Sequence, residues 1–206
     1  TDTLAEITSN VVDLSNNTTP TLNALGAGAA TTAGTEANGV AAWSSETINP
    51  GASATFPLLI ENKVGIADNY NLTAGSSNAL PTMAALPSGW TAVFRADGGA
   101  GDCSTVGATL TNTGTINAGA SRLVCAVITT PSTQTPTTQS VFFRVTSPVT
   151  NVRDTKLDEV VVNTYRDLQM ITDRTGQVFP GGSVVYEHIL TNNGNVTEGD
   201  AATEML

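Results

Sequence analysis

The chain has 206 residues, of which 40% are hydrophobic and only 13% charged, and its formal net charge of −10 corresponds to a pI near 4.2. The eight Lys and Arg residues form no basic run, which excludes a nucleic-acid-binding protein, because phosphate binding needs clustered cations. The acidic balance disfavours docking on anionic lipids, and the longest apolar runs, such as 160–162, are too short to span a bilayer.

Threonine takes much of the place that charged residues have in an ordinary soluble domain. The chain contains 34 threonines, whereas its charged fraction lies well below the roughly 25% typical of such domains. Threonine is β-branched and suits a pleated, half-exposed surface. The composition therefore predicts a β-rich extracellular protein.

The first 47 residues are expected to contain two different parts. We interpret the start, around Leu4–Ile7, as the last strand of a preceding module, and the Gly-, Ala- and Thr-rich stretch between Asn10 and Val40 as a loop or linker. A helix over Ala24–Ala30 is the alternative, although two glycines weaken it. Because the chain starts without Met or a signal peptide, we expect a processed chain or a fragment.

Seven short segments, separated by turn clusters, then follow in chain order and predict β-strands. These segments are Thr55–Glu61, Asn69–Thr73, Trp90–Arg95, Gly107–Leu110, Arg122–Ile128, Ser140–Ser147 and Lys156–Asn163. No segment carries a long apolar pattern of period 3.6 with helix caps. The pattern predicts an all-β fold, an immunoglobulin-like antiparallel β-sandwich.

An internal repeat is the most informative feature of the sequence. Asn49–Asn62 aligns without gaps to Phe179–Asn192, so that Pro, Gly, Ser, an aromatic residue, an aliphatic pair and Asn recur at one offset. Pro-Gly predicts a turn at the start of each copy, and the following run predicts a strand. A shorter repeat pairs Ile48–Ser53 with Ile116–Ser121, and a looser one pairs Leu4–Ile7 with Leu157–Val160.

These repeats predict sandwich modules in tandem. The end of a preceding module and a linker are expected in residues 1–47, and one sandwich in residues 48–163. A second, incomplete module is expected in residues 164–206.

Two cysteines, Cys103 and Cys125, lie 22 positions apart. With a single histidine in the chain, they cannot complete a four-ligand zinc site. We expect a disulfide, because the composition indicates an oxidising compartment, and closing this loop would contribute about 3 kcal/mol in the chain-entropy model. Two buried free thiols are the alternative.

The motif Thr191-Asn192-Asn193-Gly194-Asn195, which follows Pro-Gly-x-Ser and a strand, resembles the conserved Ig-like repeats of bacterial cell-surface proteins. A fuller pattern resembles modules of surface-layer and envelope proteins; it comprises Leu86-Pro87-Ser88-Gly89-Trp90, Asp102-Cys103, Val141–Ser147 and Asp154-Thr155-Lys156. The resemblance covers about Ile48 to Glu198 and implies a sandwich with a structural or adhesive role and no catalytic residues. The first copy departs from it where Lys63-Val64-Gly65 replaces Asn-Gly-Asn, which leaves the register of that hairpin open.

Calcium is the ligand that the sequence favours, because carboxylate, amide and carbonyl oxygens gather in two loops. One loop contains Asp97 and Asp102, and the other contains Asn193, Asn195 and Asp200. Neither follows the EF-hand spacing, and plain solvated loops are the alternative. No other cofactor is expected.

The chain is predicted not to be an enzyme. His188 is the one candidate for a general base and is interpreted as an ordinary strand residue. The 18 acidic residues are scattered through loops without a pattern for glycoside cleavage. Trp90 is expected to start a strand and fill the sandwich core instead of stacking on a sugar.

Together these features predict a structural component of a bacterial cell-surface assembly, such as a surface layer, fibre or envelope array. Its partners would be copies of itself or other envelope proteins, and a neighbouring subunit would complete the last module by edge pairing. An adhesin or carbohydrate-binding module is the first alternative, favoured if aromatic residues line an exposed groove. An accessory domain of a secreted enzyme is the second.

Overall fold

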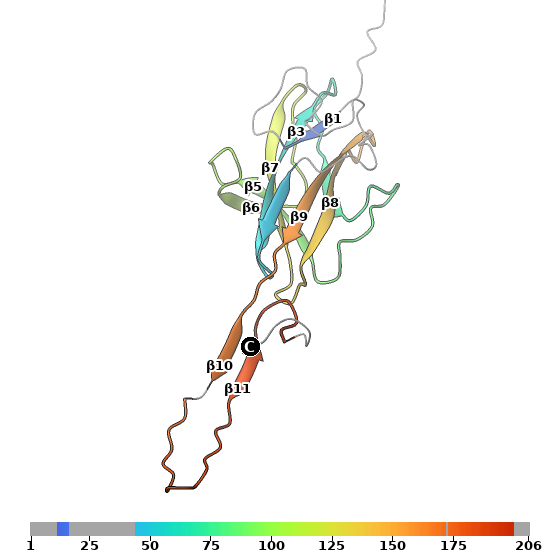
Figure 1. Cartoon of the computed structure of the whole chain (residues 1–206). Helices are drawn as coiled ribbons and strands as arrows, with labels where there is room; N and C mark the ends of the chain where they lie inside the picture. The colour runs from blue at the N-terminus through green and yellow to red at the C-terminus, as the bar shows by residue number, and fades with distance from the viewer. Residues whose placement is uncertain (1–11, 17–43, 172, 200–206) are drawn as a thin grey trace, which may run out of the picture.

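The structure is a computed structural model and describes residues 12–16, 44–171 and 173–199. Within these ranges it contains eleven β-strands and no helix, so no helix of the described residues could cross a membrane. Nine of the strands form one sandwich, and the last two form a hairpin that extends from it (Figure 1).

The first sheet has five strands in the spatial order β1-β3-β7-β5-β6, and every neighbouring pair is antiparallel. Its strands are β1 (Val12–Ser15), β3 (Ser53–Asn62), β5 (Thr91–Asp97), β6 (Val106–Leu110) and β7 (Ser121–Thr129). The second sheet has the order β2-β9-β8-β4, in which only the β2–β9 pair is parallel. Its strands are β2 (Ser45–Ile48), β4 (Asn71–Gly75), β8 (Thr137–Thr146) and β9 (Arg153–Val162).

The strand order is that of an immunoglobulin-like sandwich. The chain passes from β3 in the first sheet to β4 in the second, returns for β5 to β7, and crosses again to the antiparallel pair β8–β9. The amino-terminal strands divide between the sheets, β1 beside β3 and β2 parallel to β9. The predicted fold class is therefore confirmed, and each of the seven predicted strands corresponds to one of β3 to β9.

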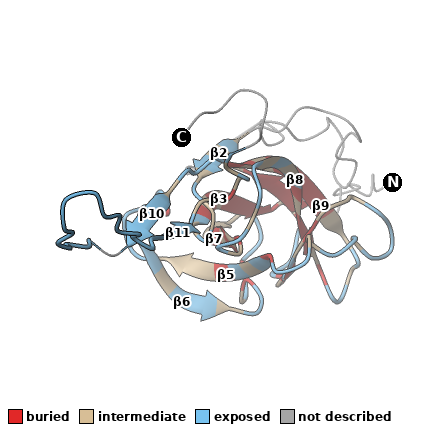
Figure 2. Cartoon of the chain, turned by 60° about the horizontal axis from the view of Figure 1, so that its bottom comes forward, coloured by how far each residue is buried: buried red, intermediate tan, exposed pale blue. Residues whose placement is uncertain are grey.

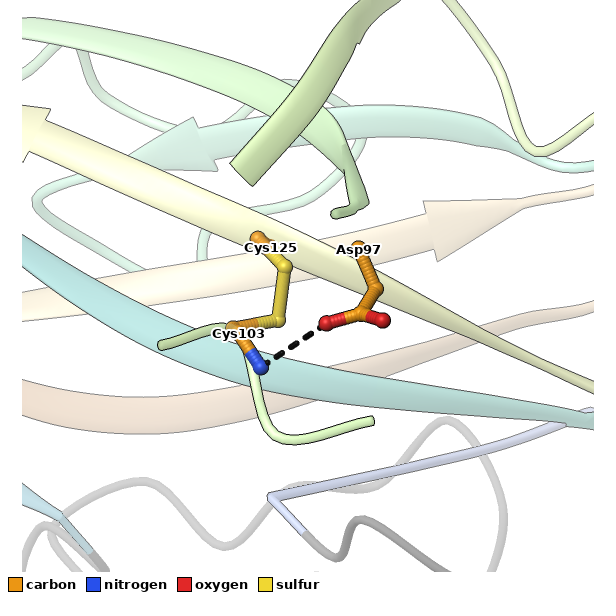
Figure 3. Close-up of side chains that lie close together, drawn as sticks. All are labelled: Asp97, Cys103 and Cys125. Atoms are coloured by element: carbon orange, nitrogen blue, oxygen red, sulfur yellow. Dashed lines mark hydrogen bonds between the residues drawn. A yellow bond between two sulfur atoms is a disulfide. The ribbon is translucent and has the colours of Figure 1, made fainter. Parts of the chain in front are cut away.

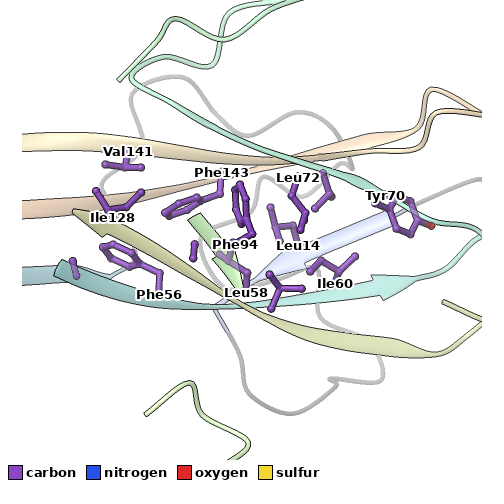
Figure 4. Close-up of a cluster of buried hydrophobic side chains, with 14 of the residues drawn as sticks. Leu14, Phe56, Leu58, Ile60, Tyr70, Leu72, Phe94, Ile128, Val141 and Phe143 are labelled. Atoms are coloured by element: carbon purple, nitrogen blue, oxygen red, sulfur yellow. The ribbon is translucent and has the colours of Figure 1, made fainter. Parts of the chain in front are cut away.

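The core lies between the two sheets and follows the alternation of side chains along each strand (Figure 4). Phe56, Leu58 and Ile60 of β3 point inward and are at most 1% exposed. The Phe56 ring centroid lies 5.4 Å from that of Phe143 on β8, so the two sheets meet through aromatic contacts as well as aliphatic ones. Trp90, just before β5, is also part of this core, as predicted.

The sandwich begins earlier than the predicted boundary at residue 48. Val12 and Leu14 of β1 are buried in the core, and β2 extends the second sheet, although both strands lie in the stretch assigned to a preceding module and a linker. Each of these strands has only four residues, too few for an alternation pattern to stand out. The looser repeat at Leu4–Ile7 and the alternative helix over Ala24–Ala30 lie outside the described residues.

Candidate assembly site at the carboxy-terminal hairpin

Residues 168–171 and 173–192 form a hairpin that points away from the sandwich (Figures 1 and 2). In it, β10 (Leu168–Ile171) pairs antiparallel with β11 (Ile189–Asn192). Every residue of both strands is exposed. A two-stranded hairpin without cover is only marginally stable in water, so this one is expected to gain stability from further packing.

Large apolar side chains concentrate on this hairpin. Of the sixteen large apolar residues that are exposed in the described chain, ten lie between positions 168 and 190. They are Leu168, Met170, Ile171, Val178, Phe179, Val184, Val185, Tyr186, Ile189 and Leu190. A contiguous set of this kind is typical of an interaction surface, whereas single exposed apolar residues are normal on any protein.

The hairpin repeats the pairing of β1 with β3. In the sandwich Val12 lies opposite Asn62 and Ser15 opposite Leu59. In the hairpin Leu168 lies opposite Asn192 and Ile171 opposite Ile189. Both ladders are antiparallel and four residues long, and the residues of β11 stand 130 positions after their counterparts in β3. The internal repeat in the sequence is thus a repeat of strand register.

The same asparagine turn ends both copies. Asn62 Nδ2 donates to the carbonyl oxygen of Ile66 at 2.9 Å, and Asn62 Oδ1 accepts from the Val64 N–H at 2.9 Å. Asn192 makes the equivalent bonds 130 positions later, to the carbonyl of Val196 and from the N–H of Gly194, both at 2.8 Å. Although Lys63-Val64-Gly65 replaces Asn-Gly-Asn in the first copy, the turn has the same register in both copies. The asparagine side chain defines this turn.

Asn195 fastens the hairpin to the sandwich. Its Oδ1 accepts from the Tyr165 N–H at 2.7 Å, and its Nδ2 donates to the carbonyls of Asn163 (2.7 Å) and Gln134 (3.0 Å). Gln134 lies in the loop between β7 and β8 and accepts a hydrogen bond from the indole N–H of Trp90 at 2.7 Å. We call this connection the Asn195 clasp; it joins the turn after β11, the segment after β9 and the core of the sandwich.

The Asn195 clasp involves one of the residues of the predicted calcium loop of Asn193, Asn195 and Asp200. Asn195 is 7% exposed and its amide is used by three protein groups. Asn193 is exposed, and Asp200 lies outside the described residues. Asn195 therefore has a structural role here that its place in an oxygen-rich loop did not indicate, and calcium at this loop stays a prediction.

The two cysteines form a disulfide, as predicted, which joins the loop after β5 to the middle of β7 (Figure 3). Their Cα atoms are 5.6 Å apart, and both residues are buried. Asp97 lies close to both sulfur atoms, but bonded sulfurs cannot bind a metal as thiolates. The alternative of two free thiols is excluded.

Asp97 organises the loop that carries Cys103. One carboxylate oxygen accepts from the N–H groups of Gly99 (2.8 Å) and Gly101 (2.9 Å), and the other accepts from that of Cys103 (3.0 Å). These backbone donors, Gly101 first, hold the pKa of Asp97 below its ordinary value. Asp102 accepts from the Ser104 N–H at 2.9 Å, and hydrogen bonds with Ser104 lower its pKa as well. Both carboxylates are engaged by the loop itself, and calcium at Asp97 and Asp102 also stays a prediction.

Charged groups are also buried where β1 meets β9. Asp158 is fully buried; its carboxylate accepts from Asn16 Nδ2 at 2.9 Å and from the Ser44 N–H at 3.0 Å. Burial raises the pKa of Asp158 to about 6, against the opposing effects of the Asn16 hydrogen bond and of Lys156. Asp154 accepts from the Leu14 N–H at 2.8 Å. The cover over β1 therefore combines apolar packing with buried carboxylates.

The remaining candidates from the sequence lie apart from one another. His188 is exposed on the hairpin, between the apolar residues of its second arm. Trp90 is 7% exposed and directs its N–H to Gln134, which removes it as a sugar-stacking residue. Trp90 therefore does not line an exposed groove, which is the feature that would have favoured a carbohydrate-binding module.

A search of family models and a search of curated proteins each found no match for this chain. Among solved structures, the chain is similar to a PapD-like domain of human CEP192, with 12% identity, a TM-score of 0.36, and coverage of 79% of this chain and 90% of that one. It is also similar to a family 123 glycoside hydrolase from Clostridium perfringens, with 11% identity and a TM-score of 0.37. That match covers 58% of this chain but only 22% of the hydrolase.

A third similar structure is AvmM, described as catalysing macrocyclization in alchivemycin A biosynthesis, with 10% identity, a TM-score of 0.37, and coverage of 68% of this chain and 89% of that one. Two of these three proteins are described as enzymes, and this overturns the prediction that the chain is not an enzyme. At these TM-scores no activity passes to this chain. The fold assignment rests on the strand order described above.

Proposed function

We propose that this chain is part of a structural protein of a bacterial cell-surface assembly, built from immunoglobulin-like modules in tandem, and that residues 164–199 open a second module. The observation that carries the proposal is the repeat of the β1–β3 ladder, with its asparagine turn, in β10 and β11. A chain that starts the same module twice is typical of repeat proteins, in which stacked modules give length and stiffness.

The Asn195 clasp supplies a mechanical role for the junction between the modules. It bonds the segment after β9 at two points, Asn163 and Tyr165, and reaches the β7–β8 loop at Gln134. Hydrogen bonds of a buried amide to three main-chain groups restrict the angle between the two parts. A fixed angle between modules is what a regular array or fibre requires.

The remaining support comes from composition and chemistry. The threonine-rich composition, the acidic balance and the disulfide favour an extracellular location, and the resemblance to surface-layer repeats agrees with it. The partners would be further copies or other envelope proteins, bound through strand edges and apolar faces instead of through membrane insertion.

The proposal is tested by imaging cell envelopes of the producing organism, with the natural protein and with two variants. An ordered lattice or filament is expected, with order lost in Asn195→Ala and kept in Asn193→Ala, an exposed neighbour of the same type. Isolated monomers in envelopes with the natural protein would overturn the proposal. A chelator arm tests calcium separately, since loss of order on chelation would support ion sites in the Asp97–Asp102 or Asn193–Asp200 loops.

A further inference from the structure

The arm of the hairpin that contains β11 has an open edge. In the sandwich, β3 pairs with β1 on one edge and with β7 on the other, over Ser53 to Glu61. In the hairpin, β11 pairs with β10 on the equivalent edge, and among the described residues no strand lies on its other edge. Strand β11 itself covers Ile189–Asn192, and at the offset of 130 residues the part of β3 that pairs with β7 corresponds to residues 183–191.

The sandwich also shows which backbone groups point to that edge. The Asn62 N–H donates to the Ala120 carbonyl at 2.9 Å, and the Thr130 N–H donates to the Ala52 carbonyl at 3.2 Å, so the even-numbered residues of β3 face β7. Backbone groups alternate in direction along a strand. At the offset of 130 residues, the backbone groups of Leu190 face the open edge of β11, and those of Val184, Tyr186 and His188 would face it when residues 183–188 continue the strand as in β3.

The side chains at these positions match the buried face of β3. Tyr186 stands at the position of Phe56 and Leu190 at that of Ile60, both of which are fully buried in the sandwich, whereas Tyr186 is 40% and Leu190 52% exposed. His188 stands at the position of Leu58 and is the polar exception. Apart from His188, this face has the pattern that β3 buries beside β7.

We propose that the open edge of residues 183–191 binds one antiparallel β-strand with the pattern of β7. That pattern is a nine-residue segment in which small or branched apolar residues, such as Val124, Ala126 and Ile128, alternate on the inward face. Backbone hydrogen bonds from the even positions fix its direction, and the apolar row beside Tyr186 and Leu190 selects the alternation. This inference rests on the proposed tandem architecture and names the partner of the hairpin.

The test uses the 206-residue chain and a peptide with the sequence of residues 121–129, in which Ser replaces Cys125. Binding is measured by fluorescence anisotropy, and amide hydrogen exchange locates it. The peptide is expected to protect the amides of residues 184, 186, 188 and 190. A peptide of the same composition, scrambled so that its alternation is lost, is expected to give no protection.

Three variants distinguish pairing at the strand edge from non-specific hydrophobic association. His188→Pro removes an N–H that faces the open edge and is expected to weaken binding about tenfold, as for the loss of one well-placed hydrogen bond with a steric cost. Glu187→Pro is the matched control, because β3 carries Pro57 at the equivalent position; it should change binding less than about twofold. His188→Leu restores the pattern of β3 and is expected to tighten binding.

Equal protection by the scrambled peptide would overturn the proposal, as would equal loss from both proline variants. Protection of residues 183–191 that appears at high chain concentration without peptide would also overturn it, since the occupant would then be a second copy of the hairpin. Failure of the peptide while envelopes still show an ordered array would refute this partner and leave the proposed function standing.

Discussion

The ladder β1–β3 and the ladder β10–β11 have the same register and the same asparagine turn, yet their surroundings are opposite. Leu14 and Ile60 are fully buried, whereas Met170 and Leu190, their counterparts in the second ladder, are 68% and 52% exposed. The difference shows that the register of the ladder does not determine whether its side chains are buried. Burial is supplied by β7, β8 and β9, and these neighbours make the β1–β3 ladder part of a core.

The two ladders also differ in their polar contacts. Around β1 the sandwich places Asp154 and Asp158 of β9, which accept hydrogen bonds from Leu14 and Asn16. Around β10 the contact with the sandwich is made by the Asn195 clasp. The β1–β3 ladder is therefore stabilised across its whole face, and the β10–β11 hairpin at its base.

The largest difference between the two ladders is expected when equivalent apolar residues of β3 and β11 are truncated to Ala. Ile60→Ala is expected to lower the free energy of unfolding by about 2–5 kcal/mol, because it removes buried methyl groups and leaves a cavity. Leu190→Ala, 130 positions later, should change it by no more than about 0.5 kcal/mol, since water already surrounds that side chain. Urea unfolding measures both. A similar loss for both variants would mean that the hairpin is already covered in solution.

The disulfide should separate the two ladders in a second way, because Cys103 and Cys125 both lie in the sandwich. Replacing both cysteines by Ala is expected to cost about 3 kcal/mol of sandwich stability, with a 22-residue loop released in the unfolded state. Hydrogen exchange of the β11 amides should stay the same. Faster exchange in β11 as well would contradict the separation and show that the hairpin unfolds with the sandwich.

Sequence patterns were sufficient for β3 to β9, since each combines an apolar or alternating run with turn residues at its ends. They were also sufficient for the repeat, because the two copies that end at Asn62 and Asn192 align at one constant offset without gaps. They missed β1 and β2, because four residues such as Val12–Ser15 carry too little alternation. The pairing partner of a short strand is set by tertiary contact.

The candidate sites were less accessible to sequence reasoning. Asn195 donates a hydrogen bond to the carbonyl of Gln134, 61 residues away, and no local sequence pattern predicts such a contact. The role of Asp97 could have been predicted, because the glycines that follow it are a sequence signal for a closed loop. The glycines at 99 and 101 adopt φ values of +105° and +80°, which lets the backbone N–H groups curl toward the carboxylate. An Asp followed by such glycines predicts a loop closed on its own side chain.

The pH dependence of stability should sharpen the contrast between the covers of the two ladders. Burial raises the pKa of Asp158 from 3.8 to about 6, so the folded chain holds this proton more tightly than the unfolded chain does. Stability from this group is then complete below pH 3.8 and is lost as the pH rises to about 6, by an amount on the order of 3 kcal/mol. Asp158→Asn should flatten the profile between pH 4 and 6.

Urea unfolding at half-unit pH steps gives this profile for the natural chain and the variant. The lowered pKa values of Asp97 and Asp102 act below pH 3.8 and with the opposite sign, so they do not overlap with this window. A natural chain whose stability rises from pH 4 to 6, or an Asp158→Asn variant with an unchanged slope, would contradict a raised pKa of Asp158 in the folded chain.

The smallest effect is expected from the asparagines that end the two ladders. Asn62 makes the turn bonds and two more, from Nδ2 to the Ile116 carbonyl at 2.8 Å and from the buried Tyr70 hydroxyl to Oδ1 at 2.9 Å. Burial, together with Asp68, raises the pKa of Tyr70 to about 12 and keeps that hydroxyl a donor. Asn62→Ala would leave buried groups without partners and should cost about 2 kcal/mol.

Asn192 makes the turn bonds on an exposed strand end, where water replaces a lost partner, so Asn192→Ala should cost about 0.5–1 kcal/mol. Binding of the β7 peptide would change this difference. If residues 183–191 acquire the neighbour that β3 has, the cost of Asn192→Ala should move toward that of Asn62→Ala in the presence of saturating peptide. An Asn192→Ala cost that is the same with and without peptide would mean that the second turn stays outside any completed sheet, and that the two ladders share a local motif without sharing a module.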